Sequence, residues 1–204
     1  MGRDLYEEFD YVREIFDMAD EVTKSHISKL CFEGPMEDLT LTVNLQPAVT
    51  AVNLACLAVL KTEGRRATLT AGHSLGEYSA LACSEITDPE ATMRIVYKRG
   101  QLMHREASKH EGAMHAILGL DIDAVSRIVA EAAKAGVVAV ANHNAEKQIV
   151  ITGAPDAVEQ ASQAATEQGA KAIPLKVSGA WHSELIRGAE ADFRAALNEV
   201  TFGV

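Results

Sequence analysis

The pentapeptide Gly72-His73-Ser74-Leu75-Gly76 is the stretch that decides how this chain folds. Before it, residues 67–71 (ATLTA) have the length and composition of a short buried strand, and after it residues 77–83 (EYSALAC) are typical of a helix. A serine between two glycines at a strand-to-helix junction is the nucleophile-elbow pattern G-x-S-x-G. We expect glycine on both sides of this tight turn, because larger side chains would collide with the strand and the helix.

The predicted turn places Ser74 at the N-terminus of a helix. Free amide groups and the positive end of the helix dipole can stabilise a developing oxyanion there, and the backbone N–H of Leu75 is the expected first donor. The pentapeptide alone is equally compatible with a turn that happens to contain a serine. The flanking strand and helix patterns favour the nucleophile.

The composition is that of a globular chain of about one domain. Its 204 residues, 48% hydrophobic and 24% charged, are enough to build a sizeable core. A net charge of −10 argues against nucleic acid as a partner, because phosphate binding needs a basic face. No apolar run approaches the length of a bilayer span, and the N-terminus lacks a signal-peptide pattern. We therefore expect no membrane association and a cytoplasmic location.

The three cysteines, Cys31, Cys56 and Cys83, have neither an even count nor metal-ligand spacing, so we expect reduced thiols and no metal site. Cys56 and Cys83 lie beside apolar residues in helical patterns, which is typical of buried cysteines. An acidic protein partner would need a local basic patch on this acidic chain, and the alternative is that the basic residues are scattered and solvated. The candidates for such a patch are Lys98, Arg99, Arg105, Lys109, Lys171, Lys176 and Arg187.

The order of predicted elements separates a small subdomain from a larger core. Apolar residues at steps of three and four predict helices at about residues 3–21, 46–63, 89–107 and 184–199. Asn44 and Asp88 are the expected N-caps of the second and third. Residues 112–177 follow the order strand-helix-strand-strand-helix-strand, which is the ferredoxin-like plan. We expect this subdomain to be inserted into a core made of residues 1–111 and 178–204.

Ser74 needs a base, because a serine hydroxyl becomes a good nucleophile when an imidazole takes its proton. Among the seven histidines, His182 is the best candidate, since it lies in a glycine-containing turn at a helix start. Without an elbow serine, such a histidine would more often be a capping or surface residue. His143 lies in a polar segment, Asn142-His143-Asn144, that we expect to form a bend between two strands. His73 is interpreted as packing under the turn.

Arg99 lies next to the apolar stripe of the helix expected at 89–107. A substrate with a free carboxylate needs a partly buried cation that binds both oxygens, which favours arginine over lysine. The alternative is an ordinary surface arginine paired with a glutamate, and composition alone favours that alternative.

Three longer motifs resemble one known family. Residues 72–80 (GHSLGEYSA) closely resemble the nucleophile segment of malonyl-CoA:acyl carrier protein transacylases and of the acyltransferase domains of polyketide and fatty acid synthases. Residues 98–103 (KRGQLM) are similar to that family's arginine motif, and residues 178–183 (SGAWHS) to its histidine motif. Further landmarks match in the expected order at residues 46–48 (QPA), 112–114 (GAM) and 142–144 (NHN).

The resemblance implies an α/β-hydrolase-like core with an inserted ferredoxin-like subdomain. It implies an acyltransferase that moves a malonyl group from coenzyme A to the phosphopantetheine thiol of acyl carrier protein, in fatty acid or polyketide synthesis. Ser74 would be the nucleophile, His182 the general base and Arg99 the ligand of the malonyl carboxylate. No metal or other cofactor is implied, and the partners are malonyl-CoA and acyl carrier protein. The further substrate-binding residues implied are Leu75, Asn144 and Met103.

The resemblance also implies that both ends of the family's chain are missing here. Family members begin with a strand and a Gly-Gln-Gly-Ser-type loop that helps to form the oxyanion hole, and they continue well past the position of Val204. Trp181 stands where phenylalanine is more usual, and residues 145–147 (AEK) replace a common Ser-Pro-Gly turn. Two alternatives follow. One is a serine hydrolase that releases the acyl group to water, and the other is a catalytically impaired fragment or scaffold that only docks carrier protein.

Overall fold

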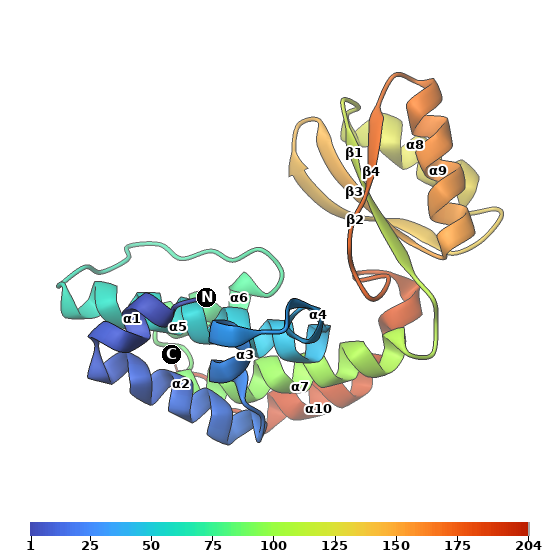
Figure 1. Cartoon of the computed structure of the whole chain (residues 1–204). Helices are drawn as coiled ribbons and strands as arrows, with labels where there is room; N and C mark the ends of the chain where they lie inside the picture. Colours follow the sequence, from blue (N-terminus) through green and yellow to red (C-terminus); the bar gives the residue numbers. More distant parts are fainter. Residues whose placement is uncertain (204) are drawn as a thin grey trace. The chain divides into compact units, whose positions relative to one another are not determined.

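The computed structural model describes residues 1–203 (Figure 1). The chain forms two compact units. The first combines Met1–Leu102 with the C-terminal residues from Asp192, and the second is Met103–Ala191. The chain contains both helices and strands, in agreement with the predicted α/β class. Helices occur in both units, whereas the only sheet of the described residues is antiparallel and lies in the second unit.

The regular elements of the first unit are all helices in its described residues, and a segment without helix or strand joins Thr62 to Gly76. Its elements are α1 (Arg3–Glu8), α2 (Asp10–Thr23), α3 (Ile27–Glu33), α4 (Met36–Leu39), α5 (Thr42–Thr62), α6 (Gly76–Cys83), α7 (Pro89–Ala107) up to Leu102, and α10 (Glu190–Asn198) from Asp192. The predicted helix at 3–21 is divided at Phe9, whose backbone is extended (φ −121°, ψ 124°) and whose carbonyl accepts the Val12 N–H at 3.1 Å. Sequence periodicity did not show this division, because the apolar spacing continues across it.

The ends of the longer helices only partly match the prediction. Asp88 is the expected N-cap of α7, since its carboxylate accepts the Ala91 N–H at 2.7 Å. Asn44 is not the N-cap of α5, which begins earlier at Thr42 and contains Pro47 in its interior. The Asn44 amide instead donates to the Asp38 carbonyl at 2.9 Å, so it ties α5 to the end of α4.

Helix α5 is the centre of the first unit's core. Its residues Ala48, Ala51 and Leu54 are buried in one cluster with Val12 and Phe16 of α2. The helix is also long and apolar enough, by length and composition alone, to cross a membrane, with a mean hydropathy of 1.6 over its best window. The prediction that no run approaches this length is therefore wrong. Core helices of other proteins often have the same composition, and 39% of this window of α5 is buried, including residues that pack against α2.

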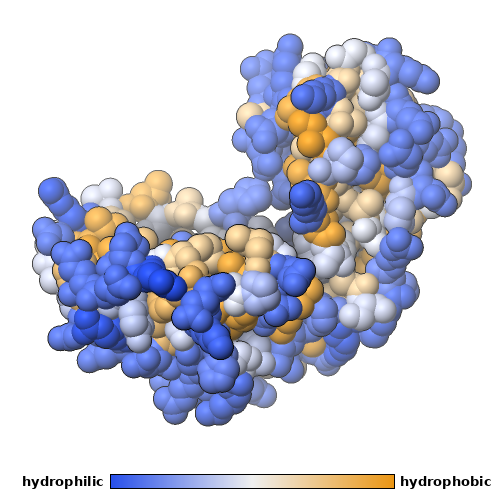
Figure 2. Space-filling view, in the orientation of Figure 1, coloured by the Kyte–Doolittle hydropathy of each residue, from blue (hydrophilic) through white to orange (hydrophobic). Residues whose placement is uncertain are grey.

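The strand predicted at residues 67–71 is not formed. A strand needs a neighbour to complete its hydrogen bonds, and no strand of residues 1–203 pairs with this segment. Leu69, expected to be buried, is 87% exposed. Figure 2 shows apolar surface in orange on the first unit, and the large apolar residues exposed there include Met36, Leu60 and Leu69.

The four strands found in residues 1–203 all lie in the second unit. Its elements are β1 (Ala113–Leu118), α8 (Ile122–Ala132), β2 (Val138–Ala145), β3 (Gln148–Gly153), α9 (Pro155–Glu167), β4 (Lys171–Pro174) and the 3₁₀ helix η1 (Glu184–Ala189). The strand-helix-strand-strand-helix-strand order is as predicted. The strands pair antiparallel in the order β2-β3-β1-β4. Helices α8 and α9 cover one face of the sheet (Figure 1), where Ile117, Ile149 and Ile151 pack against Val125 and Val158.

The segment 142–144 is part of a strand rather than a bend. It lies in β2, whose pairing with β3 shifts register between Val140 and Asn142 and again between His143 and Ala145. These irregularities let β2 continue four residues beyond the predicted end at 141, which alternation of apolar residues did not indicate.

The cysteines differ in exposure, and this gives a first testable prediction. Burial raises the pKa of the Cys31 thiol to about 11, whereas Cys56, predicted to be buried, is exposed on α5. At pH 8 roughly a thousandth of Cys31 is thiolate, the form that reacts. We expect iodoacetamide to modify Cys56 first and Cys31 last, as measured by peptide mass spectrometry over time. In urea, where burial is lost, the three should react at similar rates; fast labelling of Cys31 in the folded chain would contradict the structure.

Candidate active site

Ser74 has the backbone conformation of a nucleophile elbow. Its φ is +51°, a left-handed value that is uncommon for a residue other than glycine. The turn is closed by the Gly76 N–H on the His73 carbonyl at 2.9 Å and by the Glu77 N–H on the Ser74 carbonyl at 3.3 Å. Helix α6 begins directly at Gly76. The predicted turn and helix are therefore confirmed, although the strand before them is absent.

Only one of the two glycines is required by the packing of this turn. A Cβ on Gly72 would lie 2.0 Å from the carbonyl carbon of Gly76 and 2.1 Å from the Glu77 nitrogen. A Cβ on Gly76 would meet nothing within 4 Å. The expectation of glycine on both sides is confirmed for Gly72 and wrong for Gly76, because no strand of the described chain packs beside Gly76.

Arg99 of α7 reaches Ser74 across the fold of the first unit. Its Nη2 donates to the Ser74 Oγ at 3.0 Å, and its Nη1 donates to the Gln46 Oε1 at 2.6 Å. The guanidinium carbon lies 5.7 Å from the centre of the Tyr78 ring. All four residues belong to the first unit. Two residues 25 positions apart in sequence, the predicted nucleophile and the predicted carboxylate ligand, are thus in hydrogen-bond contact.

The electrostatic environment leaves Arg99 without a carboxylate partner. Burial lowers the pKa of its guanidinium, and a hydrogen bond and charge interaction with Tyr78 oppose that shift. Burial likewise raises the pKa of the Tyr78 hydroxyl, with Arg99 acting in the opposite direction. Within residues 1–203 no carboxylate forms an ion pair with Arg99, since Glu77 acts on it only at longer range. The alternative of a surface arginine paired with a glutamate is therefore wrong.

Gln46 and Tyr78 are site residues that the sequence did not assign. Gln46 is only 4% exposed on α5, and its Nε2 donates to the Thr42 hydroxyl at 2.9 Å, which orients its oxygen toward Arg99. An amide side chain within the apolar helix α5 could have suggested a role for Gln46. Its partner Arg99 lies 53 residues away in sequence, so the sequence does not connect the two. Tyr78 belongs to the motif at residues 72–80, and its role depends on its contact with Arg99 of α7, which local sequence does not indicate.

The Leu75 backbone N–H is available to a ligand. The N–H groups of Gly76 and Glu77 close the turn, whereas that of Leu75 has no hydrogen-bond acceptor within residues 1–203. It follows Ser74 directly at the start of α6. An N–H in this position can donate to an oxyanion formed on a group attached to the serine.

The other predicted site residues lie in the second unit. His182 is exposed in the turn before η1 and has a left-handed φ of +63°. Asn144 is exposed near the end of β2, and Met103 is buried on α7. Their predicted roles remain predictions. In residues 1–203 no group of three or more His, Cys, Asp or Glu side chains is placed to hold a metal ion.

Comparison with known families gives one match over the whole described chain. Residues 1–203 match the acyl transferase domain. The chain belongs to this acyl transferase family. The resemblance of residues 72–80, 98–103 and 178–183 is thereby confirmed at the level of the family.

Named members of the acyl transferase family are similar along nearly all of this chain. The malonyl CoA-acyl carrier protein transacylase of Bacillus subtilis (strain 168) is 44% identical over 200 residues, 97% of this chain and 63% of the relative. That of Escherichia coli (strain K12) is 37% identical over 204 residues, 99% of this chain and 66% of the relative. This acyl transferase chain therefore spans about two thirds of the length of the curated relatives it matches.

Solved structures of the family have the same fold over this chain. An acyl carrier protein S-malonyltransferase from Vibrio cholerae matches with a TM-score of 0.92 and 39% identity, covering 100% of this chain and 67% of its own. A malonyl-transacylase in complex with its type II PKS acyl-carrier protein matches with a TM-score of 0.94 and 38% identity. The match covers 100% of this chain and 66% of the transacylase chain.

Proposed function

We propose that this acyl transferase domain moves a malonyl group from coenzyme A to the phosphopantetheine thiol of acyl carrier protein, through an ester on Ser74. One observation carries the proposal: the half-buried Arg99 guanidinium donates to the Ser74 Oγ at 3.0 Å and has no ion-paired carboxylate within residues 1–203. A cation in this position favours an acyl group that itself ends in a carboxylate, because a bidentate pair with arginine is strong in a partly buried place.

The chemistry would run in two balanced halves. His182, as general base, takes the Ser74 proton while the oxygen adds to the thioester carbonyl. The Leu75 N–H donates to the resulting oxyanion. The carbon–sulfur bond then breaks, and the coenzyme A sulfur leaves with the proton from the imidazolium. In the second half the phosphopantetheine thiol attacks the ester in the same way, and Ser74 regains its proton.

The remaining predictions complete this proposal. Asn144 and Met103 would line the site for the acyl group, and the sheet unit at 112–177 would be a ferredoxin-like subdomain inserted into a hydrolase-like core. The order of its elements and the strand order β2-β3-β1-β4 support that plan. No step requires a metal or other cofactor. A cytoplasmic location is part of the same proposal, since the named relatives act on coenzyme A thioesters and acyl carrier protein.

The proposal predicts a covalent adduct. On incubation with malonyl-CoA, intact-mass measurement should show one malonyl group on the chain, and peptide mapping should place it on Ser74. Ser74→Ala should give no adduct. Ser84→Ala is the matched control, because Ser84 is an exposed serine at the end of the same helix and its hydroxyl donates to the Ala80 and Leu81 carbonyls. A folded chain without an adduct would overturn the proposal in favour of a docking scaffold, and free malonate accumulating would favour a hydrolase.

A further inference from the structure

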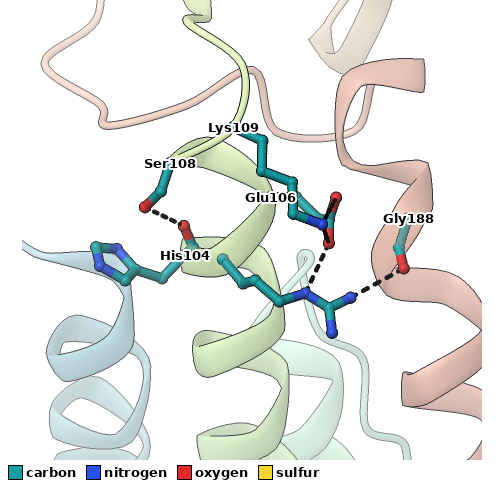
Figure 3. A network of polar contacts seen from close by, with 6 residues as sticks. His104, Glu106, Ser108, Lys109 and Gly188 are labelled. Carbon is teal, nitrogen blue, oxygen red and sulfur yellow. Dashed lines mark hydrogen bonds and ion pairs between the residues drawn. The ribbon is translucent and has the colours of Figure 1, made fainter.

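A buried carboxylate stands at the end of α7 in the second unit. Glu106 is 3% exposed, and its Oε1 accepts from the Arg105 Nε at 2.7 Å and from the Lys109 Nζ at 2.9 Å (Figure 3). Its Oε2 also accepts from Lys109 at 3.1 Å. Two cations thus share one carboxylate that solvent barely reaches, which distinguishes this group from an ordinary surface ion pair.

The same group contacts the backbone of η1. Arg105 Nη2 donates to the Gly188 carbonyl at 3.0 Å, as Figure 3 shows. A Cβ on Gly188 would lie 2.5 Å from the Glu106 Oε2, so no larger residue fits there without moving the helix or the carboxylate. We name Arg105, Glu106, Lys109 and Gly188 the Glu106 cluster. It fixes η1 against the end of α7.

The chain before η1 is held by the same part of the protein. A Cβ on Gly179 would lie 2.8 Å from the Ala107 Cβ, and one on Gly112 would lie 2.3 Å from the Ala180 nitrogen. Close backbone packing therefore fixes the segment leading into the turn. Ser183 completes it, since its hydroxyl donates to the Ala180 carbonyl at 2.7 Å and accepts the Leu185 N–H at 3.2 Å.

His182 lies between these two anchored segments. Its φ of +63° is a conformation that residues other than glycine adopt at a cost, and it persists only where the surrounding structure fixes it. Close packing at Gly179 and Ala180 restrains the residues before it, and the Glu106 cluster restrains η1 after it. Releasing either side would let the turn relax toward ordinary backbone angles and move the imidazole.

We infer that the Glu106 cluster is a positioning device for His182: by holding η1 on the end of α7, it holds the turn in the conformation from which the imidazole works. The anchoring follows from the contacts of the second unit alone. That the imidazole works as the base for Ser74 rests on the proposed function.

The charge state of the cluster agrees with this role. The Lys109 hydrogen bond and the Arg105 contact hold the pKa of Glu106 below its ordinary value, against the opposing effect of burial. Glu106 is therefore ionised at neutral pH. The stabilisation that the ionised Glu106 gives to the folded state is complete above the ordinary glutamate pKa. It is lost as the pH falls through the lowered pKa of Glu106. No other titratable group forms a hydrogen bond or ion pair with the Glu106 carboxylate in residues 1–203.

The test compares two glutamates that each pair with a lysine three residues on. Glu106→Gln removes the buried charge, whereas Glu131→Gln removes an exposed one on α8 that pairs with Lys134 in the turn after the helix. For Glu106→Gln we expect Ser74 acylation by malonyl-CoA to slow by about 10- to 100-fold with KM unchanged, because small displacements of a catalytic group have effects of that order. Hydrogen exchange in residues 180–190 should become faster. Glu131→Gln should change neither.

A second variant separates position from charge. Gly188→Ala keeps every charge, but its Cβ would lie 2.5 Å from the Glu106 Oε2, so either η1 or the carboxylate must move and their contact is disturbed. It should therefore reproduce the loss in kcat and the faster exchange even if Glu106→Gln does not fold. His182→Ala tests the proposed function separately. If His182→Ala does not slow acylation, the base assignment fails. If His182→Ala does slow it while Glu106→Gln and Gly188→Ala match Glu131→Gln in both measurements, the positioning inference is overturned.

Discussion

Arg99→Ala should slow the loading of Ser74 from malonyl-CoA by about 10²- to 10³-fold, because removing one partner of a buried charge pair has an effect of that size. Loading from acetyl-CoA should stay the same or rise, since an acetyl group has no carboxylate for Arg99 to bind. The ratio of the two rates, measured by intact mass over time, is the quantity that should collapse. The prediction follows from the 3.0 Å contact between the Arg99 Nη2 and the Ser74 Oγ.

Two further variants make this result specific. Arg99→Lys keeps the charge but not the planar fork that contacts Gln46 and Ser74 together, so we expect only partial recovery. Arg94→Ala is the matched control, because Arg94 lies on the same helix, is exposed and pairs with Glu90 one turn away. It should leave both rates unchanged. Unchanged malonyl loading in Arg99→Ala would show that another group binds the carboxylate.

Local sequence signals predicted the elements of this fold better than their ends. The elbow turn, α6, α7 with its Asp88 cap, and the order of the sheet unit all follow from short-range chemistry. The prediction of a strand at 67–71 is wrong because a strand needs a neighbouring strand to complete its hydrogen bonds. Local sequence does not show whether one is present, and no strand of residues 1–203 pairs with this segment. The start of α5 was misplaced because Asn44 bonds to Asp38 rather than to its own helix. Exposure of Cys56 depended on which face of α5 meets α2, which periodicity did not resolve.

The candidate site shows the same division. Ser74 and Leu75 could be predicted from a motif whose backbone geometry is local. Arg99 was assigned by resemblance, since composition favoured a surface residue, and its contact with Ser74 is tertiary. Gln46 belongs to a landmark of the family, but the sequence assigns it no role, because nothing in α5 indicates what its amide faces. Residues that act through neighbours on other elements are those that sequence reasoning missed.

The turn that presents Ser74 should be broken by a single methyl group at Gly72. The Cβ of Gly72→Ala would lie 2.0–2.2 Å from three backbone atoms of Gly76 and Glu77, none of which is a flexible side chain. The turn must therefore open, which moves the Ser74 Oγ away from the Arg99 Nη2 and changes the direction of the Leu75 N–H. We expect Ser74 acylation to fall by about 10²-fold or more, as displacements of around 1 Å can produce.

Gly76→Ala is the matched control for this turn, because it adds the same methyl group four residues later. Its Cβ meets nothing within 4 Å, and alanine favours the first turn of α6 more than glycine does. Acylation should be unchanged and the free energy of unfolding equal or slightly higher, as measured by urea denaturation. The core of α2 and α5 lies outside the turn, so Gly72→Ala should keep its helical circular dichroism. Equal acylation by the two variants would show that the strained geometry at Ser74 is not required for its reactivity.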